Sequence, residues 1–119
     1  MGSVHIIKRG DNAPSLSDTI RDSNGAVPNL VGATVYFHYV ETLDGVTPKT
    51  GATVNTKTVT IVSASSGDIR VDFTSADTAT AKRYIGEYEV RNGVARETFP
   101  NAPYDWVEVL VVQDLADGA

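Results

Sequence analysis

Apolar and polar residues alternate along several short stretches of this chain. The clearest stretch is 68–74, DIRVDFT, in which Ile69, Val71 and Phe73 fall on one face of an extended strand. The stretch 33–41, ATVYFHYVE, has the same period of two. This period is typical of half-buried β-strands. Strands are therefore predicted, in addition to one hairpin, over residues 4–8, 15–21, 33–41, 53–63, 68–74 and 104–112.

The hairpin is predicted over 85–100, IGEYEVRNGVARETFP, with Asn92-Gly93 at its turn. An Asn-Gly pair tolerates the positive φ angles of a two-residue type I′ turn. Such a turn places Glu89 opposite Arg96, so that an ion pair joins the two strands.

The same register places Phe99 opposite Gly86, where the ring covers the bare glycine backbone. Tyr84, Gly86, Tyr88 and Val90 then share the core face. Pro100 lacks an N–H group and ends the ladder.

Helical periodicity is nearly absent. Residues 75–82, SADTATAK, form the one predicted helix, of one or two turns, which Ser75 caps. Residues 42–52 are turn-rich and are predicted to form a loop or an irregular hairpin. Regularly spaced strands without intervening helices favour an antiparallel β-sandwich or barrel. We expect one domain over 1–119, ordered over about 4–112.

The composition narrows the classes of partner. The formal net charge is −5 over 119 residues, which argues against nucleic acid or an anionic membrane as the main partner. The chain has no cysteine, so thiol chemistry and thiolate metal sites are excluded. No apolar run approaches the length of a transmembrane helix, so we expect no membrane insertion.

Residues able to perform chemistry are scattered. His5 and His38 are far apart in sequence, and each lies in a predicted strand. Asp68 and Asp72 share a strand face but stand about 13 Å apart, too far to act together on one sugar ring.

The stretch 22–25, DSNG, does not fit the calcium-binding loop pattern and is predicted to be a plain turn. The sequence therefore predicts no catalytic, cofactor-binding or metal-binding residue, and a protein that is not an enzyme. One alternative is a sugar-stacking platform made of Trp106, Tyr104 and Tyr36.

The last predicted strand is apolar on both faces, whereas a sandwich strand normally turns one face to water. The strand at 33–41 has the same property. One explanation is that a loop or the C-terminal tail covers the second face. The preferred hypothesis is a partner interface buried on assembly. Its predicted residues are Tyr36, Val40, Trp106, Leu110 and Val112.

A series of short segments resembles one known family when the segments are taken in order. They are IKRGD (7–11), APSL (13–16), DSNG (22–25), LVGATV (30–35), GDIRVDF (67–73), ADTA (76–79), YIGEYEV (84–90) and TFPN (98–101). Their order is similar to that in the N-terminal domain of phage baseplate upper proteins. The chain departs from that family at 80–83, where TAKR replaces a shorter step.

The resemblance implies an immunoglobulin-like β-sandwich that attaches fibre or receptor-binding parts to a phage tail. It implies a structural virion protein without catalytic residues or cofactors, made in the host cytoplasm. It also implies that other tail or baseplate proteins are its partners, with several copies in a symmetric assembly. Two alternatives remain, a capsid decoration protein and a carbohydrate-binding module.

Overall fold

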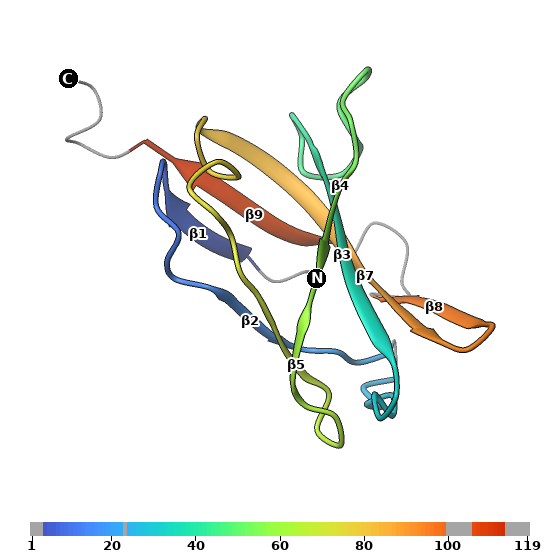
Figure 1. The fold of residues 1–119 in the computed structure, drawn as a ribbon. Helices are drawn as coiled ribbons and strands as arrows, with labels where there is room; N and C mark the ends of the chain where they lie inside the picture. The colour runs from blue at the N-terminus through green and yellow to red at the C-terminus, as the bar shows by residue number, and fades with distance from the viewer. Residues whose placement is uncertain (1–3, 23, 100–105, 114–119) are drawn as a thin grey trace.

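The computed structural model describes residues 4–22, 24–99 and 106–113, and these form nine β-strands (Figure 1). The first five strands are β1 (Val4–Lys8), β2 (Leu16–Thr19), β3 (Thr34–Glu41), β4 (Asn55–Thr58) and β5 (Thr60–Ser63). The other four are β6 (Asp68–Val71), β7 (Lys82–Asn92), β8 (Ala95–Phe99) and β9 (Val107–Val112). The start of the predicted strand at 104–112, with Tyr104, lies outside the described residues, as does Pro100.

The strands form two sheets that pack as a β-sandwich, which confirms the predicted fold class. The larger sheet has the order β1-β9-β7-β3-β4, with β8 paired to β7. The smaller sheet has the order β2-β6-β5. The faces predicted for 68–74 and for the hairpin are confirmed as well, since Ile69, Val71 and Tyr88 are buried between the sheets. Phe37 and Val109 of the larger sheet are buried there too.

One strand pair is parallel, so the prediction of a purely antiparallel fold is wrong there. β1 pairs with β9 in parallel, with Ile6 opposite Leu110. The chain leaves β1 for the smaller sheet instead of turning back beside it, so β1 is free to pair with the last strand. The N–H of Arg9 donates to the carbonyl of Val112 and extends this ladder by one bond.

The predicted strand at 53–63 is divided between the two sheets. β4 pairs with β3 in the larger sheet, and β5 pairs with β6 in the smaller one. The crossing falls at Val59, whose side chain is buried in the core and whose N–H donates to the carbonyl of Val35. Sequence periodicity does not reveal such a crossing, because the residues on both sides of it are extended.

The predicted helix at 75–82 is wrong, since residues 75–80 form turns and Lys82 already belongs to β7. The side chains of Thr74 and Asp77 each accept a bond from the other's backbone N–H, so the cap is Thr74 and not Ser75. The carbonyl of Thr78 accepts from the N–H of Gly10, and its hydroxyl donates to the carbonyl of Asp11. The bond from Gly10 occupies the Thr78 carbonyl, which a further helical turn would need as an acceptor.

The hairpin exists, but its turn lies one residue further along than predicted. Asn92 pairs with Ala95, so the two-residue loop is Gly93-Val94, with Gly93 at φ +63°. A glycine at the first loop position is typical of a type II′ turn. The shift places Phe99 opposite Tyr88, deep in the core, and moves Glu97 toward the tip. The predicted Phe99–Gly86 pairing is therefore wrong.

Gly86 is covered by a different ring. A Cβ atom at Gly86 would collide with the ring of Phe37, which is fully buried in β3. The prediction that an aromatic ring covers this glycine is thus correct in kind, although the ring comes from the neighbouring strand. The φ angle of Gly86 is not positive, so the reason for glycine here is space.

Candidate functional site

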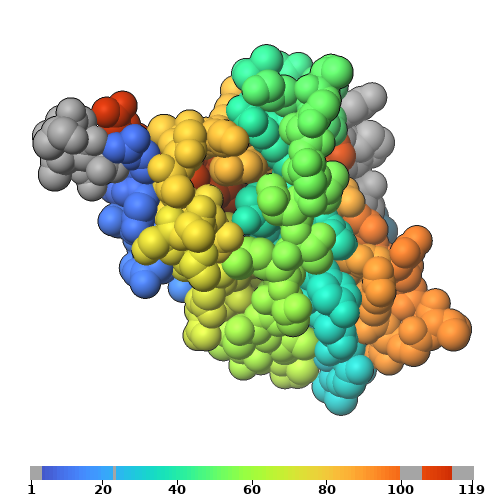
Figure 2. Space-filling model, turned by 45° about the horizontal axis from the view of Figure 1, so that its top comes forward, coloured from blue at the N-terminus to red at the C-terminus, as the bar shows by residue number. Residues whose placement is uncertain are grey.

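The candidate site is the outer face of the larger sheet, which points away from the smaller sheet. Core-facing residues of β3, β7 and β9 are buried, while most of their alternate neighbours on the outer face keep some exposure. In Figure 2 the 42–52 loop forms the top of the molecule (teal to green), and the β7–β8 hairpin projects at one side (orange). All five predicted interface residues lie on this face or at its margin.

The 42–52 loop covers one part of the face. Val40 is only 8% exposed, so it is already buried within the chain. The indole Nε1 of Trp106 donates to the carbonyl of Val46 at 2.6 Å, which ties the start of β9 to the loop. For Val40 and in part for Trp106, the explanation that a loop covers the second apolar face is therefore correct.

The loop is held by one carboxylate. Asp44 accepts bonds from the backbone N–H groups of Val46 and Thr47 and from the hydroxyls of Thr47 and Thr42. These bonds, with the Thr47 N–H first, hold the pKa of Asp44 far below its usual range. Gly45, at φ +77°, lies against the guanidinium of Arg83. The bonds to Asp44 therefore fix the shape of the loop, and the contact between Gly45 and Arg83 holds it on the sheet.

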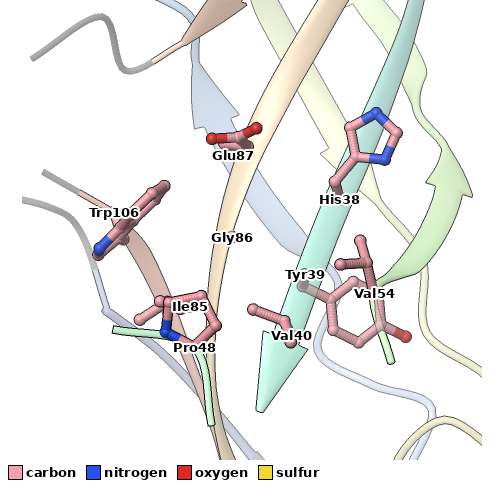
Figure 3. Close-up of a pocket in the computed structure, with 9 residues that line it drawn as sticks. All are labelled: His38, Tyr39, Val40, Pro48, Val54, Ile85, Gly86, Glu87 and Trp106. Atoms are coloured by element: carbon pink, nitrogen blue, oxygen red, sulfur yellow. The ribbon is translucent and has the colours of Figure 1, made fainter. Parts of the chain in front are cut away.

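A cavity of about 160 Å³ lies between this loop and the sheet (Figure 3). The side chains of Val40, Ile85, Val54 and Pro48 form its apolar part, and Trp106 stands at one side. Figure 3 shows Glu87 and His38 together on the opposite side from Ile85 and Pro48. The cavity thus has an apolar floor and a polar rim.

A cluster of charged groups lies next to the cavity, around Glu89. Its carboxylate accepts from Nε2 of His38 at 2.8 Å and from Nε of Arg91 at 3.0 Å, and it forms an ion pair with Arg96 at 3.2 Å. The predicted Glu89–Arg96 ion pair is confirmed, although Glu89 directly faces Thr98 in the observed register and reaches Arg96 diagonally.

The negative charge of Glu89 and the positive charges around it stabilise one another. The hydrogen bonds from Arg91 first, and then from His38, lower the pKa of Glu89. The same contact with Glu89 raises the pKa of Arg91, whose guanidinium also lies 5.1 Å from the ring centroid of Tyr36. Arg91 and Arg96 are directly opposite each other, so Glu89 offsets their repulsion. Tyr36 therefore belongs to this cluster and not to an apolar patch.

The remaining two predicted residues, Leu110 and Val112, lie in an apolar strip at the edge of the sheet. Parallel pairing places Val4 and Ile6 of β1 on the same face, with Ile6 opposite Leu110, Val4 opposite Glu108 and Lys8 opposite Val112. Val4 and Ile6 are 55% and 56% exposed, whereas Leu110 and Val112 are half-buried. We call these four residues the β1–β9 strip. Among the described residues, β1 is an outermost strand of its sheet, so the strip ends at a free edge.

Sequence reasoning missed Val4 and Ile6. The sequence shows the alternation of VHIIK. It does not show that β1 lies beside β9, because nothing in it specifies parallel pairing between the first and last strands. The signal that was available is that Ile6 and Ile7 are adjacent, so that one of them must point away from the core.

The other candidate residues have local roles. Nε2 of His5 donates to the carbonyl of Pro14, 3.0 Å away, and His38 binds Glu89, so the two histidines do not meet. Asp22 accepts bonds from the N–H groups of Asn24 and Ala26, as expected for a plain turn. Asp68 accepts from Thr19, and Asp72 pairs with Arg70.

Within the part of the chain that the structure describes, no helix is long and apolar enough to cross a membrane. Comparison with protein-family models and with curated proteins gives no match to this chain.

Proposed function

We propose that this chain is a structural virion protein of a tailed phage that works as a tail or baseplate adaptor. In this role it attaches fibre or receptor-binding parts through protein–protein contacts and performs no catalysis. The observation that carries the proposal is the β1–β9 strip, in which four aliphatic side chains share one face of a sheet edge around the opposed pair Ile6 and Leu110. Glu108 and Lys8 complete the cross-strand pairs at its two ends. Single exposed apolar residues need no explanation, but a contiguous group is typical of an interaction surface.

The strand order supports the immunoglobulin-like part of the proposal. In an immunoglobulin sandwich, strands B, E and D lie in one sheet, and strands C, F and G in the other, with C′ added in variable-type domains. Here β2-β6-β5 lie opposite β4-β3-β7-β9. If the strands are assigned in chain order, with β8 as an addition to the hairpin after β7, the two arrangements correspond. An immunoglobulin-like sandwich is the fold that the family resemblance implies, so this correspondence supports the proposal.

A free edge strand adds a second means of contact. The outer side of β1 has backbone N–H and C=O groups that can extend the ladder with a strand from a partner. Such an extension would bring the partner's side chains directly over Val4 and Ile6. Backbone pairing and apolar contact would then act together on one surface.

The carbohydrate-binding alternative has less support than the adaptor, because two of the aromatic residues proposed as its platform have other contacts. Tyr36 is stacked against the guanidinium of Arg91, and Trp106 is half-buried beside the loop. Tyr104 lies outside the described residues. A glycan array tests this alternative directly, and saturable binding to a sugar would favour it over the adaptor.

The adaptor proposal is tested by locating the protein in purified particles. Antibody-gold labelling under the electron microscope should place the chain at the tail end of the phage that encodes it. Labelling over the capsid would favour the decoration protein instead. Absence from the purified particles would overturn a structural virion role altogether.

A further inference from the structure

Glu87 has an unusual position for a carboxylate on a crowded sheet. It is half-buried at the rim of the cavity, and it has no hydrogen-bond or ion-pair partner in the described part of the chain. Its cross-strand neighbour is His38, but the imidazole is directed to Thr56 and Glu89, 2.8 Å from each. The negative charge of Glu87 is therefore available to a group from outside.

The space beside Glu87 is apolar and large enough to hold a small apolar group. An apolar protein cavity of about 150 Å³ is large enough to hold a benzene molecule, and this one has about 160 Å³. The indole of Trp106 stands across from Val54 at its margin (Figure 3). Because Nε1 of Trp106 is bonded to Val46, and Asp44 braces the loop, these walls are set before any ligand arrives.

We propose that this cavity binds the side chain of a lysine or arginine from a protein partner. The methylene stem would lie against Val40 and Ile85, and the cation would face the carboxylate of Glu87 and the indole of Trp106. Long basic side chains bury their stems on apolar surface while their charged ends stay near water. An indole attracts cations through its π-face, and a carboxylate adds direct charge attraction.

No lysine or arginine of this chain lines the cavity in the described structure, so the proposed cation comes from the partner. All ten Lys and Arg residues of the sequence lie within the described ranges, and none pairs with Glu87. The net charge of −5 favours the approach of a basic partner. This inference deepens the proposed adaptor function, on which it rests for the existence of a protein partner, by giving that partner's chemistry.

The chain offers a direct reporter, because Trp106 is its only tryptophan. Selectively excited Trp fluorescence is recorded while acetyl-Gly-Lys-Gly-amide, or its arginine equivalent, is titrated at constant ionic strength. Acetyl-Gly-norleucine-Gly-amide is the control probe, since it has the same stem without the charge. Glu87→Gln removes the charge at the cavity. Asp72→Asn makes the same change of net charge just after β6 (Asp68–Val71) of the other sheet, and circular dichroism confirms that both variants are folded.

We expect a saturable spectral change with the basic peptides in the wild type and in Asp72→Asn. The norleucine peptide should bind the wild type about fivefold more weakly than the basic peptides do. The Glu87→Gln variant should bind the basic peptides about fivefold more weakly than the wild type does, as for the loss of one exposed charge pair. Equal binding of norleucine, or unchanged binding by Glu87→Gln, would overturn the proposal, as would no saturable change. Because particle labelling does not depend on Glu87, a negative peptide result with label at the tail would remove this inference alone.

Discussion

Gly86 is a position in the larger sheet that has no room for a side chain. A Cβ atom there meets the ring of Phe37 and approaches the carbonyl oxygen of His38 to 3.1 Å. Gly86→Ala should therefore lower the free energy of unfolding by about 1–3 kcal/mol, as overpacking of a core does. Urea denaturation measures the change.

The same substitution in a Phe37→Leu background provides the control. If the ring is the obstacle, the Gly86→Ala penalty should be clearly smaller once the ring is gone, because residues in contact do not act additively. An equal penalty in both backgrounds would show that Phe37 does not cover Gly86.

Glu89 should make the stability of the protein depend on pH. Its pKa lies below the ordinary value of 4.5, so its contribution to stability is present in full above that pH and is lost as the pH falls below it. Glu89→Gln removes the contribution. The melting temperatures of wild type and variant should therefore differ most near neutral pH and converge in acid. A difference that does not change with pH would contradict the charge cluster.

At the residue scale, the sequence predicted which positions are buried better than it predicted which residues contact one another. Alternation placed Ile69, Val71 and Tyr88 on the faces that are buried, because burial follows from the period of two alone. The ring over Gly86 was assigned to Phe99 instead of Phe37, because contacts across strands depend on a register that the sequence does not specify.

At the scale of elements, the β7–β8 turn offers the sharpest test. Gly93 has φ +63°, and a Cβ atom there would meet nothing within 4 Å, so any penalty comes from the backbone alone. Gly93→Val should cost about 1–2 kcal/mol, since β-branched residues are poorly suited to this region. Thermal or urea unfolding measures it.

Val94 provides the matched position in the same turn. It is fully exposed, so Val94→Ser should change stability by less than about 0.5 kcal/mol. A neutral Gly93→Val would mean that the turn does not have the observed conformation. An equally harmful Val94→Ser would mean that the tip packs against something.

Elements were predictable where local pattern decides them and not where tertiary contacts do. The strand at 33–41 was predicted to within a residue, because its alternation is long. The segment 75–82 contains good helix-forming residues, yet Thr78 accepts a bond from the N–H of Gly10 and donates one to the carbonyl of Asp11, and these bonds hold the segment as turns. The crossing at Val59 likewise depends on where two sheets lie, which no short window of sequence contains.

At the scale of the whole molecule, the predicted interface separates into three parts. Val40 and Trp106 line the cavity, Tyr36 belongs to the cluster around Glu89, and Leu110 and Val112 belong to the β1–β9 strip. The sequence could predict that both faces of these strands are apolar. It could not predict which part the 42–52 loop covers, because local bonds to Asp44 shape the loop while a bond from the distant Trp106 positions it on the sheet.

The central claim is that the protein works through contacts made by the β1–β9 strip. Leu110→Asp tests it, because Leu110 lies on the outer face opposite Arg83, where a carboxylate can be tolerated. Val109→Asp is the matched control on the same strand. Val109 is 1% exposed, and a charge there should unfold the domain.

The decisive measurement is the incorporation of the Leu110→Asp chain into particles, made by phage that carry the variant gene, with circular dichroism to establish folding. The account predicts that the variant is folded and absent from particles, while Val109→Asp does not fold. A folded Leu110→Asp chain that joins the particle as well as the wild type would contradict the proposed role of the strip.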